Sequence, residues 1–515
     1  MTERLRLSDH NRRWWTLGAM SFALFMVMLD NTAVNVALPS IQKDFGASLS
    51  ALEWTVNAYT LTFAVLLVTG GRLGDIFGRR RMFLLGVVVF SLASATIGFA
   101  PTEGWLVASR ALQGVGAAFM MPATLSIITN AFPPEERGKA IGTWAGVSAI
   151  ALAVGPLLGG WLTEEVSWRA IFFLNLPVAV GAIVVTLFAA EESRDETVGR
   201  EVDIPGIAAM TIGLTALVFA LVEGNGWGWG SPAIFGLLAL SVAALTAFVA
   251  IERRAVAPIV DLEALRSKQF LGANLVAFLV SFGMFAMFFF LALYMQNILG
   301  YSPLEAGVRF LPSTVVIIFA GPIAGRLADR IGPRPLIVSG MLITALSLAW
   351  QSRIDVDTSF TFLLPPFVLM GLGMGLVMSP MSVAGMNAVD RTKAGVASGT
   401  LSMSRMVGGT FGVAALGALV ATIGRRDLEQ SLPQASPGAR ERLAEGLGSG
   451  VSLDAPPQAV SAAQAAFVDA LGAGLAVSAA ALAAGALAAW LLIAPGRPSA
   501  ATPLPEAAEA ELVPA

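Results

Sequence analysis

Two ten-residue stretches decide the fold. Residues 71–80 read GRLGDIFGRR, and residues 325–334 read GRLADRIGPR, which repeats the first stretch at an offset of 254 residues. A second motif recurs at the same offset, because residues 137–140 (RGKA) are matched by residues 391–394 (RTKA). Two separate motifs that share one offset indicate an internal duplication. We therefore expect two homologous halves.

The stretches between these motifs are apolar enough to cross a membrane. Of the 515 residues, 56% are hydrophobic and only 13% are charged, whereas a soluble domain has about 25% charged residues. A membrane-spanning helix needs about 20 apolar residues. We expect an all-α polytopic membrane protein with 14 transmembrane helices, at residues 16–38, 51–70, 82–100, 105–130, 140–162, 169–190, 204–222, 232–251, 270–296, 305–325, 335–352, 360–382, 394–421 and 463–494.

The positions of the Lys and Arg residues fix an orientation for these spans. The first run is too long for the apolar core of a signal peptide, so we expect it to be retained. With both termini in the cytoplasm, most of the 32 Lys and Arg residues fall in inner segments, as the positive-inside rule requires. We therefore expect a multi-pass protein of the inner (plasma) membrane with both termini cytoplasmic.

The offset of 254 residues also divides the chain, because it pairs the second span with the tenth and the fifth with the thirteenth. Two parallel six-helix halves are typical of transporters, in which substrate binds between the halves; the alternative is a repeat that serves packing alone. We expect a cytoplasmic N-terminal tail (1–15), an N-terminal bundle (16–190), an inserted helix pair (204–251), a C-terminal bundle (270–494) with an extracytoplasmic loop (422–462), and a disordered cytoplasmic tail (495–515).

Several kinds of chemistry are excluded by composition. The chain has no cysteine, and its single histidine is His10, so neither a Cys or His catalytic set nor a metal site of these residues is available. The net charge of −3 gives no basic surface for nucleic acid. No phosphate-binding G-x-x-x-x-G-K-S/T motif is present. We expect that the chain is not an enzyme and that it binds no cofactor, no metal and no nucleic acid.

The repeated stretch has a mechanical interpretation. Gly71 and Gly78 would allow a tight turn and close helix ends in the segment 71–81, and Asp75 would face a helix N-terminus. Arg79 and its neighbours would contact anionic headgroups. The alternative is a basic cytoplasmic turn with no further role. Because that alternative does not require an acid in the repeat, we assign conformational gating to these residues and to their counterparts, Gly325 and Asp329.

The motifs together resemble those of a known family. The loop stretch is similar to the signature G-x-L-x-D-x-x-G-R-R/K of the major facilitator superfamily. Three further stretches resemble motifs of its 14-span drug:proton antiporters, the EmrB/QacA-like multidrug exporters. These stretches are Leu29–Pro39 (LDNTAVNVALP), Arg110–Gly116 (RALQGVG) and Gly155–Gly160 (GPLLGG). Trp168–Pro177 and Tyr294–Ser302 also look typical. The resemblance covers residues 16–421 and implies two six-helix bundles with two inserted helices, and export coupled to protons.

Two charges lie inside the expected spans at a similar depth. At 1.5 Å per residue, Asp30 and Arg110 each fall about 9 Å from the outer face of a hydrocarbon core about 30 Å thick. A lone charge there costs several kcal/mol, so we expect pairing or neutralisation. The corresponding positions of the second half, Met284 and Leu364, are apolar. We assign proton coupling to Asp30 and Arg110; the alternatives are a structural acid and a packing anchor.

Helix 5 and helix 13 carry two further candidates. Gly146, Gly155 and Pro156 favour close packing and bending, which would seal the site during turnover; ordinary small-residue packing is the alternative. Arg405 lies about 11 residues into the thirteenth span, where it would bind an anionic group or a carboxylate. Methionine and aromatic side chains adapt to varied apolar ligands. The substrate-binding candidates are Asn35, Asn57, Tyr59, Gln113, Trp144, Phe285, Met378 and Arg405.

The sequence therefore favours a monomeric secondary transporter that exports amphiphilic drug-like compounds by alternating access in exchange for protons. Its partners would be the small-molecule substrate, protons and the lipid bilayer. Export of a lipid, a siderophore or a self-made antibiotic is the alternative on the same fold, and uniport or import is another. A membrane-embedded enzyme or a sensor would need a nucleophile, base or metal set, which the sequence does not offer.

Overall fold

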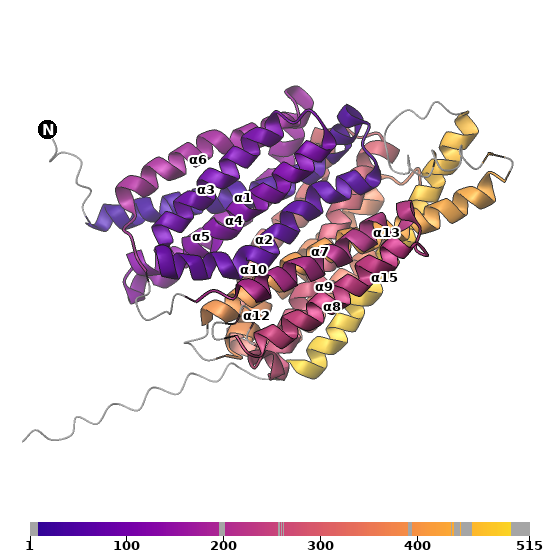
Figure 1. Ribbon diagram of the computed structural model, residues 1–515. Coiled ribbons are helices and arrows are strands. Elements are labelled where there is room, and N and C mark those ends of the chain that lie inside the picture. Colours follow the sequence, from indigo (N-terminus) through magenta and orange to yellow (C-terminus); the bar gives the residue numbers. More distant parts are fainter. Residues whose placement is uncertain are drawn as a thin grey trace, which may run out of the picture.

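Helices make up the regular structure in the part of the chain that the structure describes (Figure 1). The computed structural model describes residues 9–194, 201–255, 258, 260, 262–389, 394–433, 435–436, 443 and 456–495. The elements are α1 (Asp9–Phe45), α2 (Leu49–Phe77), α3 (Arg79–Gly98), α4 (Glu103–Ala131), α5 (Pro134–Glu165), α6 (Arg169–Ala189), α7 (Ile204–Trp227), α8 (Pro232–Glu252), η1 (Ala264–Arg266), α9 (Lys268–Leu293), η2 (Tyr294–Ile298), α10 (Pro303–Ile331), α11 (Pro333–Gln351), α12 (Phe360–Met386), α13 (Ala394–Ser431) and α15 (Pro457–Leu492).

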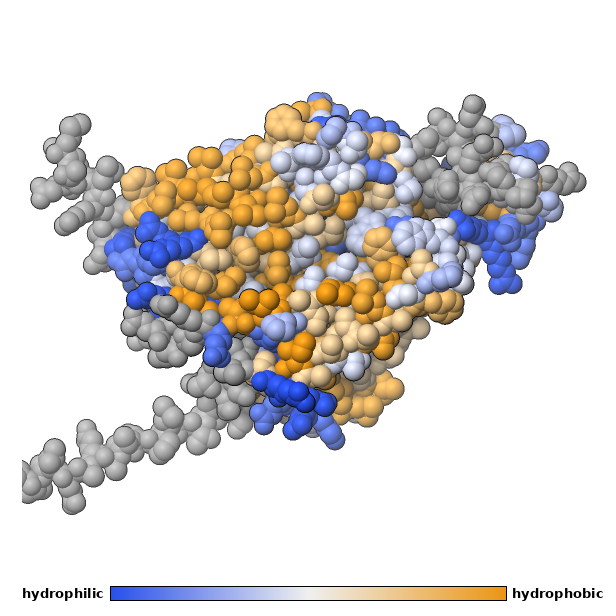
Figure 2. Space-filling view, viewed as in Figure 1, coloured by the Kyte–Doolittle hydropathy of each residue, from blue (hydrophilic) through white to orange (hydrophobic). Residues whose placement is uncertain are grey.

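The helices have the length and composition of membrane spans. Among the described residues, 13 helices are long and apolar enough to cross a bilayer. The remaining expected span corresponds to α5, a helix of 32 residues in which several side chains lie outside the description. Figure 2 shows apolar residues over the middle of the molecule and hydrophilic residues toward its two ends. The prediction of an all-α polytopic fold is therefore confirmed.

The same set of helix contacts occurs twice. In the first part of the chain α4 packs on α2 and α3, and α1 packs on α5 and α6. In the second part α12 packs on α10 and α11, and α9 packs on α13 and α15. The two groups lie side by side in Figure 1, the first in indigo to purple and the second in salmon pink to yellow. This repeated packing is what a duplicated helix bundle produces.

The repeated stretch forms a helix end and not a long turn. We expected a turn over residues 71–81, which is wrong, because α2 continues to Phe77 and α3 begins at Arg79. A single residue, Gly78, breaks the helix with a φ of +113°, and Gly332 breaks α10 from α11 with a φ of +85°. A side chain is rarely tolerated at such angles. The glycine in each repeat therefore separates two helices by one residue.

Two helices extend beyond the boundaries that hydropathy predicted. α1 begins at Asp9, inside the expected tail 1–15, and its exposed start is held by ion pairs from Arg12 to Glu191 and from Arg13 to Glu136. α13 continues to Ser431, inside the expected loop 422–462. Hydropathy detects only the lipid-facing part of a helix, so these polar turns were missed. The rest of that loop, apart from a few residues, and the tail after Pro495 lie outside the described residues.

The two bundles contact each other at the end of the molecule opposite the Arg79–Arg81 turn. Between α5 and α10, an added Cβ at Gly160 or Gly307 would meet backbone atoms of the other helix. Between η2 and α1, the Gln296 Nε2 donates to the Val36 carbonyl at 2.8 Å. We call this end the closed end and the end with Arg79–Arg81 the basic end. Small residues bring the backbones together and close one side of the interface.

The inserted pair packs against both bundles. α7 lies on α8 and contacts α2 and α13. Glu223 of α7 accepts hydrogen bonds from Ser50 Oγ at 2.7 Å and from Trp54 Nε1 at 3.0 Å, both on α2. Asn225 donates to the Ala418 carbonyl of α13 at 2.8 Å. α7 therefore covers the seam between the two bundles.

Close helix crossings predict a sharp difference between two glycine substitutions. In α4 a Cβ on Gly116 would meet the Phe90 backbone nitrogen and the Gly86 carbonyl of α3, whereas a Cβ on Gly236 in α8 would have no atom of a neighbouring segment within 4 Å. Gly116→Leu should destabilise the protein by about 1–3 kcal/mol because it forces the helices apart. Gly236→Leu, the matched control, should leave the melting temperature of the detergent-purified protein unchanged. Equal melting temperatures for the two variants would contradict this packing.

Candidate functional site

A buried ion pair lies in the middle of the first bundle. Arg110 of α4 donates through Nη1 to Asp30 Oδ2 of α1, and the two residues are 1% and 0% exposed. Arg110 Nε donates to the Thr55 carbonyl of α2 at 3.0 Å. Its guanidinium carbon lies 4.3 Å from the centre of the Tyr59 ring. The charge of Arg110 is therefore balanced by a carboxylate, a carbonyl and an aromatic face.

Neutral side chains complete the hydrogen bonding of Asp30. Gln113 Nε2 donates to Asp30 Oδ1 at 3.0 Å, and Asn175 Nδ2 of α6 donates to the same oxygen at 3.3 Å. Both amides also donate to Ser94 Oγ of α3, at 2.8 and 3.1 Å. Three donors from α4 and α6 therefore converge on one buried carboxylate. Loss or gain of a proton at Asp30 would therefore rearrange contacts among several helices.

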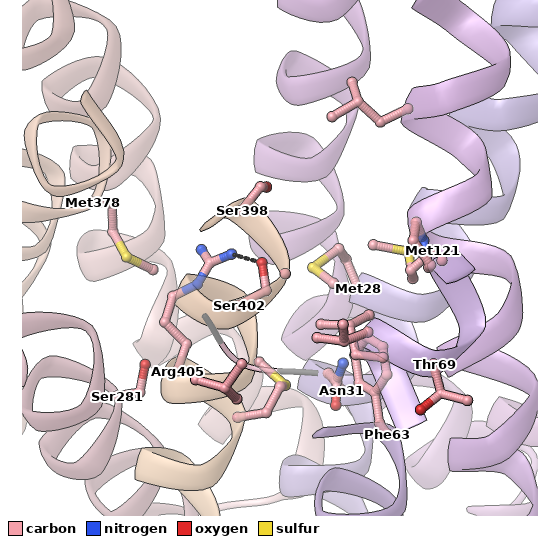
Figure 3. Close-up of a pocket in the computed structure, with 18 of the residues that line it drawn as sticks. Met28, Asn31, Phe63, Thr69, Met121, Ser281, Met378, Ser398, Ser402 and Arg405 are labelled. Atoms are coloured by element: carbon pink, nitrogen blue, oxygen red, sulfur yellow. Dashed lines mark hydrogen bonds between the residues drawn. The ribbon is translucent and has the colours of Figure 1, made fainter. Parts of the chain in front are cut away.

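A large cavity lies between the two bundles, beside this network (Figure 3). Its volume is about 1590 Å³, and its walls come from α1, α2, α4 and α5 on one side and from α9, α10, α12 and α13 on the other. It extends to Arg72, Asp75 and Arg266, which lie toward the basic end. Because the bundles meet at the closed end, the cavity is accessible from one side of the molecule.

The cavity contains five of the eight predicted substrate-binding residues. Asn35, Trp144, Phe285, Met378 and Arg405 line its wall. The other three predicted residues are not on the wall: Asn57 and Tyr59 are fully buried within the first bundle, and Gln113 is bonded to Asp30. Asp30 and Arg110 are also absent from the wall, although Asn31, the neighbour of Asp30, is part of it. The ion pair and the cavity are adjacent but separate.

The predicted gating residues of α2 and α3 lie at the basic end. Asp75 pairs with Arg79 one turn later, at 2.9 Å, and does not show a bond to a separate helix N-terminus. Gly71 and Asp75 line the cavity. A Cβ on Gly78 would meet the carboxylate of Glu192. In the second repeat, Gly325 lies against Ser379 of α12, and the side chain of Asp329 lies outside the described part.

The predicted gating residues of α5 lie against α1 and α10. A Cβ on Gly155 would meet the Thr32 hydroxyl of α1, and the Pro156 carbonyl abuts Gly307 of α10. Pro156 also lines the cavity. Gly146 is helical, but its surroundings lie outside the description. α5 therefore contributes both to the cavity wall and to the interface between the bundles at the closed end.

Two members of the network were not identified from the sequence. Asn175 is a lone amide in the apolar stretch of α6, and that polarity was a usable signal. Ser94 gave none, because single serines are common in membrane helices and satisfy their hydroxyl locally. Among the described residues, no group of three His, Cys, Asp or Glu side chains is placed to hold a metal ion.

Comparisons with known proteins agree with this arrangement. A sequence model described as Major Facilitator Superfamily matches residues 20–413. The Tetracenomycin C resistance and export protein of Streptomyces glaucescens is 38% identical over 80% of this chain and 76% of its own. Puromycin resistance protein pur8 of Streptomyces alboniger is 42% identical over 79% and 81%. The multidrug resistance protein Stp of Mycobacterium tuberculosis (strain ATCC 25618 / H37Rv) is 35% identical over 84% and 80%.

A solved structure shares the fold. The bacterial homologue of the human lysosomal transporter Spinster, in an inward-facing and unoccupied conformation, matches with a TM-score of 0.67. The match covers 93% of this chain and 97% of that structure at 17% identity. The likeness therefore concerns the arrangement of the helices.

The ion pair predicts a thermodynamic coupling between its two members. Arg110→Met leaves a buried carboxylate without its cation and should cost about 3–5 kcal/mol of stability. The double variant Asp30→Asn, Arg110→Met should recover part of that loss, because no uncompensated charge remains. Thermal unfolding of the four purified proteins gives the coupling energy as a double-mutant cycle. Strictly additive effects would contradict the pairing.

Proposed function

The chain belongs to the Major Facilitator Superfamily, and from this premise we propose that it exports amphiphilic drug-like compounds from the cytoplasm in exchange for protons. Like the members of its family, it is a multi-pass membrane transporter and not an enzyme; its named relatives are resistance and export proteins. The observation that carries the proposal is the buried Asp30–Arg110 pair beside a cavity that opens on one side.

Alternating access is supported by the asymmetry of the two ends. The cavity opens toward the basic end, while Gly160 and Gly307 hold α5 and α10 together at the closed end. The polar ties across the closed end include the bond from the Leu304 backbone to Glu164 at 3.1 Å. Rocking the bundles about the cavity would separate these helices and expose the same site to the other side. One chain supplies both walls, which supports a monomer as the functional unit.

Proton coupling is assigned to Asp30 because of its surroundings. Its three donors, Arg110, Gln113 and Asn175, come from α4 and α6, so a shift of either helix relative to α1 changes the contacts of the carboxylate. Asp30 is fully buried here, so a proton must reach it in another arrangement of α1, α4 and α6. That requirement links proton exchange to the conformational cycle.

The substrate assignment rests on the cavity wall. Met28, Met121 and Met378 are flexible and apolar, and Trp144 and Phe285 add flat aromatic faces. Such a wall accommodates ligands of varied shape. The volume of about 1590 Å³ exceeds the 300–1,000 Å³ of typical ligand pockets. A bulky amphiphile fits these features.

Export of one self-made antibiotic is the second candidate. Two relatives with extensive coverage carry the names of single compounds, tetracenomycin C and puromycin. A lipid or a siderophore would use the same fold. The comparison of compounds retained by cells with and without the protein distinguishes a narrow substrate range from a broad one.

Substitution of Asp30 tests the proton assignment. In proteoliposomes with an internal pH-sensitive dye, addition of the neutral amphiphile N-phenyl-1-naphthylamine should dissipate an imposed proton gradient. Asp30→Asn should abolish this drug-driven proton movement while binding of N-phenyl-1-naphthylamine to the purified protein, measured by its fluorescence, persists. Asp44→Asn is the matched control, because Asp44 lies at the C-terminal end of the same helix, has a side chain that is 41% exposed and pairs with Arg169. Full proton movement in Asp30→Asn would refute the assignment.

The proposed orientation places the basic end and both termini in the cytoplasm of a plasma-membrane protein. The chain has no cysteine, so single cysteines can be introduced without removing others. Gly230→Cys, in the turn between α7 and α8, should react with a membrane-impermeant maleimide in intact cells. Ala255→Cys, after α8, should react only after permeabilisation. The reverse pattern would invert the topology.

A further inference from the structure

Arg405 is a cation without a counter-charge in the wall of the cavity. It lies on α13, and Figure 3 shows its guanidinium beside Ser402 within the cavity. Its Nη2 donates to Ser402 Oγ at 3.2 Å, and its Nε is buried without a hydrogen-bond partner. Among the described residues, no carboxylate pairs with it. This contrasts with Arg110, whose charge is balanced on every side.

The other charged residues of the cavity lie near its mouth. Arg72 and Asp75 are in the last turns of α2, and Asp203 caps the start of α7. Glu252 and Arg253 lie at the end of α8, and Glu263 and Arg266 lie beside and in η1. Arg405 is 11 residues from the start of α13, which is about 16 Å along the helix at 1.5 Å per residue. Within the described part of the chain, the deep region of the cavity therefore carries one charge, and that charge is positive.

Hydroxyl groups surround Arg405 on its own side of the cavity. Ser398 and Ser402 come from α13, and Ser281 comes from α9 (Figure 3). The Ser281 side chain is buried, and its Oγ has no hydrogen-bond partner. Two buried donors, the Arg405 Nε–H and the Ser281 O–H, therefore lack acceptors. The opposite wall, with Met28, Phe63 and Met121, is predominantly apolar.

An oxyanion matches this combination of donors. A guanidinium binds the two oxygens of a carboxylate through parallel hydrogen bonds, and such bonds are strong when water is excluded. An unpaired cation at membrane depth is costly, so a ligand that neutralises it gains binding free energy. An apolar body attached to the anion would lie against the methionine and phenylalanine side chains across the cavity.

We propose that Arg405, together with the Ser281 and Ser402 hydroxyls, is an anion-binding subsite, and that the cavity selects amphiphiles with a carboxylate or similar oxyanion. The inference rests on the proposed export function and narrows its substrate class. It separates the tasks of the two arginines at membrane depth, because Arg110 serves the ion pair and Arg405 serves the ligand.

Two probes that differ by one sulfonate test the subsite. 8-Anilino-1-naphthalenesulfonate is an anion, and N-phenyl-1-naphthylamine is its neutral counterpart. Fluorescence titration of the purified full-length protein in nanodiscs should give tighter binding for the sulfonate. Arg405→Met should weaken sulfonate binding by about tenfold or more, because a charge-assisted hydrogen bond is lost, and should leave the neutral probe within about twofold. Arg405→Lys should retain part of the preference.

Two further variants keep the test informative. Arg353→Met removes an exposed cation that does not line the cavity and should change neither affinity. Ser281→Ala should weaken binding of the sulfonate alone, and by less than Arg405→Met does. This variant replaces Arg405→Met in the test if Arg405→Met does not fold. Equal losses for both probes, or no preference for the sulfonate in the wild-type protein, would overturn the inference.

The outcome can be distinguished from failure of the proposed function. If the wild-type protein moves protons in response to N-phenyl-1-naphthylamine but Arg405→Met does not lose its sulfonate preference, only the anion subsite is wrong. If no compound drives proton movement while the sulfonate still binds through Arg405, the coupling proposal fails and the subsite stands.

Discussion

A polar group in hydrocarbon must find a partner within the protein, because each unsatisfied group costs several kcal/mol. This constraint forces the backbone into helices and brings Asp30 and Arg110 of the first bundle into one network. Asp30 and Arg110 are tolerated at depth because Gln113, Asn175 and the Thr55 carbonyl complete their hydrogen bonding. Those contacts join α1, α2, α4 and α6, so the ion pair also ties the first bundle together.

The interface between the bundles follows a different rule. The closed end is held mainly by close backbone approach at Gly160 and Gly307, with few polar ties such as the bond between Thr60 and Thr410 at 2.7 Å. Packing of small residues is stable in lipid without the strong charge pairs that would be costly to break. A seam of this kind can open and re-form during a transport cycle.

The sequence was informative where the physics depends on position along a helix. The depth of Asp30 and Arg110 followed from the rise per residue, and Gly78 and Gly332 were found through the repeat. The rotation of each helix was not predictable, because a membrane helix is apolar toward lipid and also toward its neighbours. Tyr59 and Gln113 therefore face the interior of the first bundle, while Phe285 and Met378 face the cavity. Asn175 was missed for a related reason, since its partners lie on other helices.

On the proposed assignments, the proton and the substrate bind to opposite halves. Asp30 belongs to the first bundle and is closed off from the cavity, while Arg405 belongs to the second and faces it. Direct competition between the two ligands for one side chain is therefore not the basis of exchange. The coupling must be a difference in proton affinity between two arrangements of the bundles, which substrate binding at the cavity shifts. Such coupling does not require a fixed ligand shape, which is consistent with a cavity lined by adaptable methionines.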